Sequence, residues 1–205
     1  FPVEIVYRLA QKLDTIKGVA GMRSASHSPG PQARPILVSD ALVWRMGRRS
    51  VLIAQGRIAA YDPAEPPPEA LRIDGSGQLL LPGLVEAHTH LDKTLWGMGW
   101  RPNTAGPRLI DKIENERRVR REIGIDPERQ SGRQVRLSVA KGSTLFRTHV
   151  DVDTECGLSG VEGVMRTREA HQAIMDMEIV AFPQSGLVTR PGTRELMDQA
   201  LAMGA

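Results

Sequence analysis

The sequence predicts an α/β fold in which a small β unit precedes strands that alternate with helices. Between residues 36 and 81, short runs of aliphatic residues are separated by clusters of Gly, Pro and Asp, a pattern typical of strands and turns. From residue 82 onward, apolar runs alternate with longer segments of helical character. This alternation indicates βαβ units and a parallel sheet.

Residues 1–35 are expected to form a tail or leader outside the fold. The start, FPVEIVYRLAQKLDTIKGVAG, lacks the basic region, apolar region and cleavage site of a secretory signal. It also lacks an initiator methionine, and Met22 opens a stretch rich in Ser, Pro and Gly. The chain therefore divides into this tail, a small β domain at 36–81 and an α/β part at 82–205.

The small β domain is expected to contain strands within the runs PILVSDALVW, SVLIAQGRIAAYD and ALRIDGSGQLLL. The segments RMGRR, DPAEPPP and DGSGQ separate them as turns. AEPPPE is too rich in proline to lie inside a strand, because proline has no N–H for the ladder.

The α/β part begins with the predicted strand QLLLPGLVEAHTH at 78–90, followed by a loop and a helix around 107–124. A second helix is predicted to start at Asp126-Pro127, an N-cap residue followed by proline at the first helical position. Further strands are predicted at 143–152 and 178–184, with a loop or helix between them, and a last helix opens near Thr193.

Composition and charge weigh against two classes of partner. No run approaches 18 consecutive apolar residues, so no membrane span is expected. The net charge is only +3, and basic residues alternate with acidic ones. In DKIENERRVRREIG, Glu114 precedes Arg118 by four residues and Glu116 precedes Arg120 by four. That spacing favours ion pairs on a solvated helix over a nucleic-acid surface.

The chain has a single cysteine, Cys156, so it forms no intramolecular disulfide, and a reducing cytoplasm is the expected location. One cysteine also excludes the zinc deaminases built on the P-C-x-x-C motif. Nothing near Cys156 in the sequence resembles an activating base, so we expect an inert thiol.

His88 and His90 are the candidate metal ligands. On a strand, side chains two residues apart share a face with Cα atoms roughly 6.6 Å apart, so two imidazoles can converge on one ion. Glu86 lies on the same face. The pair stands at the carboxyl end of a strand that opens a βα series, the position where barrel enzymes carry their active sites.

Other candidates follow on later segments. Arg147, His149 and Asp151 alternate along one strand face, and an inward orientation is favoured because burial against helices would leave charges without partners. Gln184 ends the next strand, where its amide offers both donors and an acceptor to a heterocyclic substrate. The segment from Trp96 to Trp100 either walls a pocket or packs.

The run IDGSGQLLLPGLVEAHTHLDKT resembles the signature of the amidohydrolase superfamily. LFRTHVDV and IVAFPQSG are similar to segments of its cytosine deaminase-like branch, which includes cytosine deaminases and N-isopropylammelide-type aminohydrolases. The resemblance covers residues 36–205. It implies a partial (β/α)8 TIM-type barrel of about three βα units, preceded by a small β-sandwich domain.

The resemblance also implies a chemistry. His88 and His90 would bind a single Zn or Fe ion, which lowers the pKa of a bound water, and Gln184 would hydrogen-bond the substrate ring. The hydroxide would attack the ring carbon that bears the amino group of a cyclic amidine such as cytosine, a related pyrimidine or a triazine.

The family's later histidines, its acid–base glutamate and its metal-binding aspartate have no counterpart within the 205 residues. A complete barrel takes about 250 residues. We therefore expect this chain to be the N-terminal part of a longer enzyme, inactive alone, with acid–base residues beyond residue 205 and a homo-oligomeric full-length form. Two alternatives stay open: a ring-opening amidohydrolase of the hydantoinase or dihydroorotase type, and a non-catalytic fragment that serves assembly or binds metal weakly.

Overall fold

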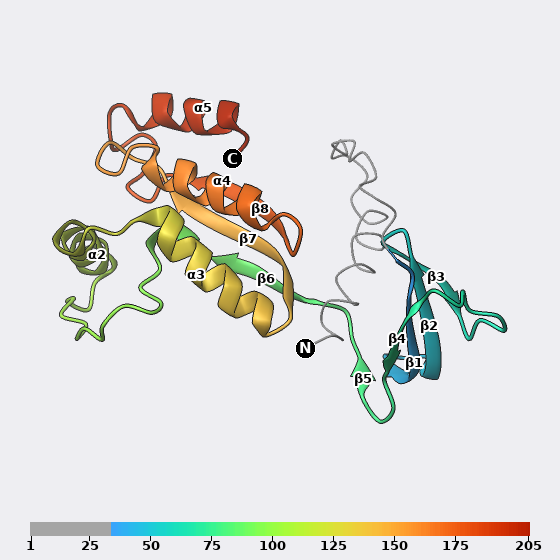
Figure 1. Cartoon of the computed structure of the whole chain (residues 1–205). Coiled ribbons are helices and arrows are strands. Elements are labelled where there is room, and N and C mark those ends of the chain that lie inside the picture. Colours follow the sequence, from blue (N-terminus) through green and yellow to red (C-terminus); the bar gives the residue numbers. More distant parts are fainter. Residues whose placement is uncertain (1–33) are drawn as a thin grey trace. The chain divides into compact units, whose positions relative to one another are not determined.

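A computed structural model describes residues 34–205, which form two compact units divided along the chain between Leu84 and Val85 (Figure 1). The first unit is a β-sheet, and the second is an α/β layer structure. The predicted α/β class is thus confirmed. Most of the predicted tail, residues 1–33, lies outside the described residues. No helix within 34–205 is long and apolar enough to cross a membrane.

The first unit is one five-stranded sheet. Its strands are β1 (Ile36–Val43), β2 (Gly47–Ala54), β3 (Arg57–Tyr61), β4 (Leu71–Asp74) and β5 (Leu79–Leu80). The order β3-β2-β1-β4 places β1 beside β2 in antiparallel pairing, and both β4 and β5 pair with β1 in parallel. The predicted strand regions are therefore found, and AEPPPE lies in the connection between β3 and β4.

One predicted strand region holds two strands. SVLIAQGRIAAYD turns at Gln55 and Gly56, whose φ angles are +53° and +70°. Two successive positive φ values give a tight hairpin that matches the twist of β2 and β3. Gln-Gly is a weaker turn signal than Asn-Gly, so the turn was missed.

Both faces of β1 are buried, which makes it the centre of the sheet. Ile36, Val38 and Ala41 join one apolar cluster. Leu37 faces the other way and packs with Leu52 and Ala70. The described residues of this unit form a single sheet, so the expected sandwich stays a prediction.

The predicted strand at 78–90 is wrong in its extent. The chain forms β5 at Leu79–Leu80, breaks at Pro82, and resumes as β6 (Leu84–Thr89) in a different sheet. Proline cannot donate to a ladder, so an otherwise continuous apolar run is divided there.

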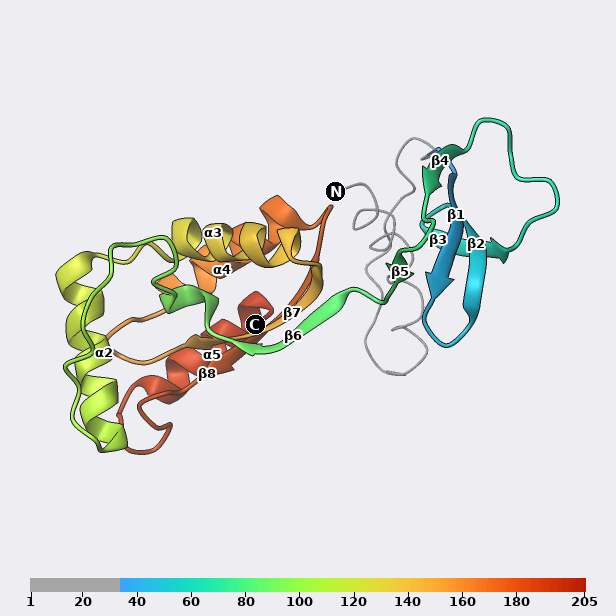
Figure 2. The same ribbon diagram turned by 90° about the horizontal axis from the view of Figure 1, so that it is seen from below.

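The second unit has a three-stranded sheet of order β6-β7-β8, where β7 is Ser143–Asp151 and β8 is Asp176–Phe182. β7 and β8 are parallel, as predicted, with Leu145 opposite Asp176 and Asp151 opposite Phe182. Helices α3 (Pro127–Ala140) and α4 (Ser159–His171) pack against each other and on one side of this sheet (Figure 2). α5 (Thr193–Met203) contacts β8, and η2 (Leu91–Lys93) follows β6.

Alternation along β7 separates an apolar face from a polar one. Phe146 and Val150 are fully buried in the core beneath α3 and α4, and Thr148 is buried between them. Arg147 and His149 therefore point to the opposite face, as expected for side chains one residue apart on a strand. Asp151, also on that face, is 3% exposed.

Candidate metal and substrate site

Three imidazoles meet on the face of the sheet opposite α3 and α4. The ring centroids of His88 and His90 are 5.5 Å apart, and their planes are inclined by 67°. His149 of β7 stacks on His88 at 4.2 Å, and its ring is 5.8 Å from that of His90. Phe182, the last residue of β8, approaches His90 and His149 edge-on at 5.9 Å each. The structure thus brings His88 and His90 together, as their spacing predicted.

Hydrogen bonds on either side of His90 fix the end of β6. Gln134 of α3 donates from Nε2 to Thr89 Oγ1 over 3.3 Å. The backbone N–H of Leu91 donates to Thr148 Oγ1 at 3.0 Å, and the Leu91 side chain is fully buried. Both contacts hold the segment between them, so the His90 side chain is directed from an anchored backbone.

His90 is uncharged near neutral pH. Burial, together with the positive charge of Lys93, lowers the pKa of His90 to about 4, although Asp151 opposes the change. Its Nδ1 lies 3.8 Å from Asp151 Oδ1 and, within the described part of the chain, has no hydrogen-bond partner. A neutral imidazole with an unpaired nitrogen is the form that binds metal ions.

Asp151 is the centre of an ion-pair network at the carboxyl end of β7. Lys93 donates from Nζ to both carboxylate oxygens of Asp151, at 3.0 and 3.2 Å, and to Glu116 at 2.9 Å. Arg120 of α2 (Leu109–Ile123) donates to Asp151 at 3.0 Å. The two cations neutralise a carboxylate that would be costly to bury alone.

Asp92 contacts two members of this network and is fully buried. One of its oxygens accepts from the backbone N–H of Asp151 at 3.3 Å and lies 3.6 Å from Arg120. Burial, reinforced by the charge of Asp151, raises the pKa of Asp92 to about 7. With a pKa of about 7, the Asp92 carboxyl is partly protonated near neutral pH.

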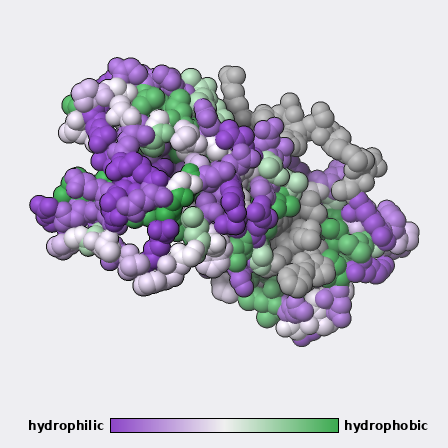
Figure 3. Space-filling model, turned by 60° about the vertical axis from the view of Figure 1, so that its left-hand side comes forward, coloured by the Kyte–Doolittle hydropathy of each residue, from purple (hydrophilic) through white to green (hydrophobic). Residues whose placement is uncertain are grey.

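Charged side chains of α2 contact this network as well as solvent. Arg120 pairs with Asp151, and Glu116 binds Lys93, so the predicted Glu116–Arg120 pair is not the contact that forms. Arg118 pairs with Glu122. α2 therefore lies across the carboxyl ends of the strands (Figures 1 and 2), and the space-filling view that brings this side forward is largely hydrophilic (Figure 3).

Gln184 lies two residues beyond the end of β8, and its backbone N–H donates to the carbonyl of Phe182 at 2.9 Å. It lines a cavity of about 200 Å³ together with Asp151 and residues of α2 and of the loop after β7. Asp151 links this cavity to the imidazole cluster, because it lines the cavity and its Oδ1 lies 3.8 Å from His90 Nδ1. Cys156 lines it as well, and burial raises the pKa of this thiol to about 11.

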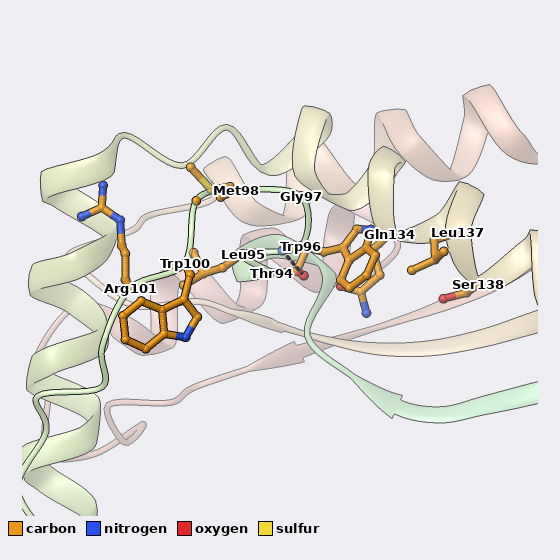
Figure 4. A pocket seen from close by; sticks show the side chains of 11 residues that line it. Thr94, Leu95, Trp96, Gly97, Met98, Trp100, Arg101, Gln134, Leu137 and Ser138 are labelled. Carbon is orange, nitrogen blue, oxygen red and sulfur yellow. Dashed lines mark hydrogen bonds between the residues drawn. The ribbon is translucent and has the colours of Figure 1, made fainter.

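A larger cavity, of about 570 Å³, is lined by none of the histidines and by neither Asp151 nor Gln184. It lies between the 94–101 loop and α3, with Trp96, Met98 and Trp100 in its wall (Figure 4). Trp100 is 87% exposed, so it borders this cavity instead of packing in the core. Polar groups able to promote chemistry gather at the smaller cavity.

The described residues fit part of a metal site. His88 and His90 offer two imidazoles on inclined planes, and the Nδ1 of His90 is buried without a hydrogen-bond partner in the described chain. Catalytic zinc takes three protein ligands. Among residues 34–205, no group of three or more His, Cys, Asp or Glu is arranged to hold a metal. The pair would need at least one further donor.

Sequence reasoning missed Asp92, Lys93 and Arg120. Lys93 and Asp92 follow the histidines directly, but nothing in their spacing shows that they reach β7 or α2. Their partners lie between 23 and 59 residues away along the chain. A local charge pattern cannot reveal such pairs.

The chain is similar in sequence and structure to known enzymes, although no family model matches it. The chain is 32% identical over 139 residues to N-isopropylammelide isopropyl amidohydrolase of Pseudomonas sp. (strain ADP), covering 64% of this chain and 34% of that enzyme. The crystal structure of N-isopropylammelide isopropylaminohydrolase from Burkholderia multivorans matches with a TM-score of 0.79 and 44% identity, over 84% of this chain and 44% of that one.

A structure of 5-methylcytosine deaminase from Klebsiella pneumoniae matches with a TM-score of 0.65 and 29% identity, over 83% of this chain and 41% of that one. The chain therefore spans about a third of the curated relative and less than half of each solved structure.

Proposed function

The homologues and structural neighbours of this chain are amidohydrolase-superfamily deaminases, matched over their N-terminal portion, and on that premise we propose that it contributes to a metal-dependent hydrolase. The reaction is hydrolysis of the bond between a cyclic amidine ring and its exocyclic amino or alkylamino group. The observation that carries the proposal is the pairing of His88 with His90 on the open face of the sheet.

In this proposal His88 and His90 supply two of the ligands of one Zn or Fe ion, since imidazole suits both metals. When bound, such an ion lowers the pKa of a coordinated water toward neutrality. His90 is already neutral above a pH of about 4, so it needs no deprotonation to bind. The described residues 34–205 supply no third ligand beside the pair, so the site requires a further donor.

Gln184 is proposed to bind the substrate ring. An amide side chain presents a carbonyl acceptor and two N–H donors, which match the alternating ring nitrogens and oxo groups of a pyrimidine or triazine. Its place in the cavity bordered by Asp151 supports this role, because Asp151 also lies beside His90. A ring held there would lie in the cavity that Asp151 lines, and Asp151 Oδ1 is 3.8 Å from His90 Nδ1.

The ion pairs of Lys93 and Arg120 with Asp151 hold the elements that carry the site together. Asp151 is 3% exposed and is held by two cations from two different elements, η2 and α2. This arrangement fixes the carboxyl ends of β6 and β7 relative to each other. Because Asp151 lies beside His90, these contacts help to keep the proposed ligands in a productive geometry.

The proposal is tested with a chimera in which residues 36–205 replace the matched N-terminal portion of the Burkholderia enzyme. We expect metal-dependent release of amine or ammonia from a panel of amino- and alkylamino-substituted triazines and pyrimidines. His88→Gln and His90→Gln should abolish turnover, while the distant control His171→Gln should not. A folded, metal-loaded chimera that hydrolyses none of these compounds would contradict the proposal.

A further inference from the structure

We propose that His149 is a positioning residue that orients the His88 ring by stacking on it, and is not itself a ligand of the same ion. This inference rests on the proposed function, in which His88 and His90 bind the metal. Its basis is the pair of nearly parallel rings of His88 and His149, whose centroids are 4.2 Å apart with an interplanar angle of 25°.

The stacking geometry separates the two roles. A metal bound to an imidazole lies in the plane of that ring, about 2.0–2.1 Å from the nitrogen. Two face-to-face rings inclined by only 25° have planes that meet well beyond such a bond length. His88 and His149 therefore cannot both bind one ion without a change of rotamer. His88 and His90, inclined by 67°, carry no such restriction.

The central strand and a neighbouring aromatic ring fix the position of His149. It lies on β7, the central strand of the sheet, opposite Val180 of β8. Phe182 meets its ring edge-on at 5.9 Å with perpendicular planes, a favourable aromatic arrangement. The His149 ring is thus contacted by Phe182 at one side and by His88 on its face.

Within the described residues, no hydrogen bond to Nδ1 orients the His149 ring. Its Nδ1 is buried without a hydrogen-bond partner among the described residues. The neighbouring cation on the same face, Arg147, is paired with Glu178 at 2.6 Å. The feature of His149 that makes contacts is its flat ring, and a phenyl ring offers the same feature.

The test is a Co²⁺ titration of the full chain, followed by the absorption of the bound ion, for wild type, His149→Phe, His149→Ala and the control Arg147→Ala. Removing a contact that orients a ligand costs about 10–100-fold in metal affinity. We expect that loss in the alanine variant, whereas the phenylalanine variant and the control should stay within about threefold of wild type. Equal losses for phenylalanine and alanine would identify a ligand and overturn the proposal, as would no loss for alanine.

A second readout separates this inference from the proposed function. If wild type binds no Co²⁺, the metal role of the histidine pair fails, but the stack can still be tested without metal. The NMR shifts of the His88 ring protons should then change in His149→Ala through loss of the ring current, and change far less in His149→Phe. Unchanged His88 shifts in the alanine variant would overturn the stacking claim.

Discussion

Asp153 ties together three segments that surround the smaller cavity, and its replacement gives a quantitative test of this packing. The residue is 4% exposed. Its Oδ1 accepts from the backbone N–H groups of Glu155 and Cys156 at 2.8 and 3.1 Å. Its Oδ2 accepts from Ser185 after β8 and lies 3.5 Å from Arg117 of α2. Loss of the carboxylate therefore affects both loops and the helix.

The expected magnitude follows from these contacts. Asp153→Ala leaves two backbone donors and the Ser185 hydroxyl without their acceptor, and it removes one of the two carboxylates beside Arg117. The free energy of unfolding should therefore fall by about 3–5 kcal/mol. Asp153→Asn keeps an acceptor for the backbone N–H groups but places an NH₂ toward Arg117. We expect a loss of about half that size for the asparagine variant.

The effect should depend on pH in one direction. Burial alone would raise the pKa of Asp153, but hydrogen bonds from Ser185 and from the backbone of Cys156 and Glu155 lower it well below its usual range. A lowered folded-state pKa contributes stability that is present above the unfolded value of about 3.9 and is lost as pH falls toward the folded value. The difference between wild type and Asp153→Asn should shrink accordingly in acid.

The assay is urea unfolding followed by far-ultraviolet circular dichroism. Within residues 34–205 all α-helices lie in the α/β unit, so the signal reports the unit that contains Asp153. A loss below about 1 kcal/mol for Asp153→Ala, the range of an ordinary exposed contact, would refute the reasoning. A difference from Asp153→Asn that grows in acid would refute the assigned direction of its pKa.

Two further predictions concern other parts of the same unit. Cys156, with its pKa raised from 9.0 to about 11, should react roughly 100-fold more slowly with iodoacetamide at mildly alkaline pH than in the urea-unfolded chain; equal rates would contradict its burial. Gly163→Ala should destabilise the unit in urea by about 1–3 kcal/mol, because a Cβ there would lie 2.8 Å from atoms of Pro127 and Glu128. Gly132→Ala, whose Cβ would meet mainly the flexible Arg136 side chain, should be neutral or stabilising, and the opposite order would be wrong for this packing.

Local chemistry made the helices of the α/β unit predictable. Asp126 caps α3 by accepting from Arg129 N at 3.1 Å, and Pro127 occupies the first turn, as the sequence indicated. The strand predicted at 143–152 is also found, at Ser143–Asp151. The start of α3 depends on contacts within a few residues. The strand pairs with β8 but is marked by a local run of residues typical of strands, so composition and spacing are sufficient to predict both.

Features that depend on distant partners were not predictable in the same way. The apolar run at 78–90 reads as one strand. On one side of Pro82 the chain pairs with β1, and on the other side it pairs with β7 in a different sheet. The charges of α2 read as a solvated pattern, yet Arg120 reaches Asp151, which lies 31 residues away. The stack of His149 on His88 likewise depends on β6 and β7 being neighbours, which a single sequence does not reveal.

The central claim is that His88 and His90 form part of a metal site. The most direct measurement is Zn²⁺ binding to the purified chain, by competition with a chromophoric chelator, for wild type, a His88→Ala/His90→Ala double variant and His171→Ala. His171 is a suitable control because its ring lies in α4, bound to the Thr167 carbonyl at 2.9 Å. Because two imidazoles are only part of a ligand set, we predict weak but saturable binding of one ion in wild type and the control, and its loss in the double variant. No binding by wild type, or equal binding by all three, would contradict the account.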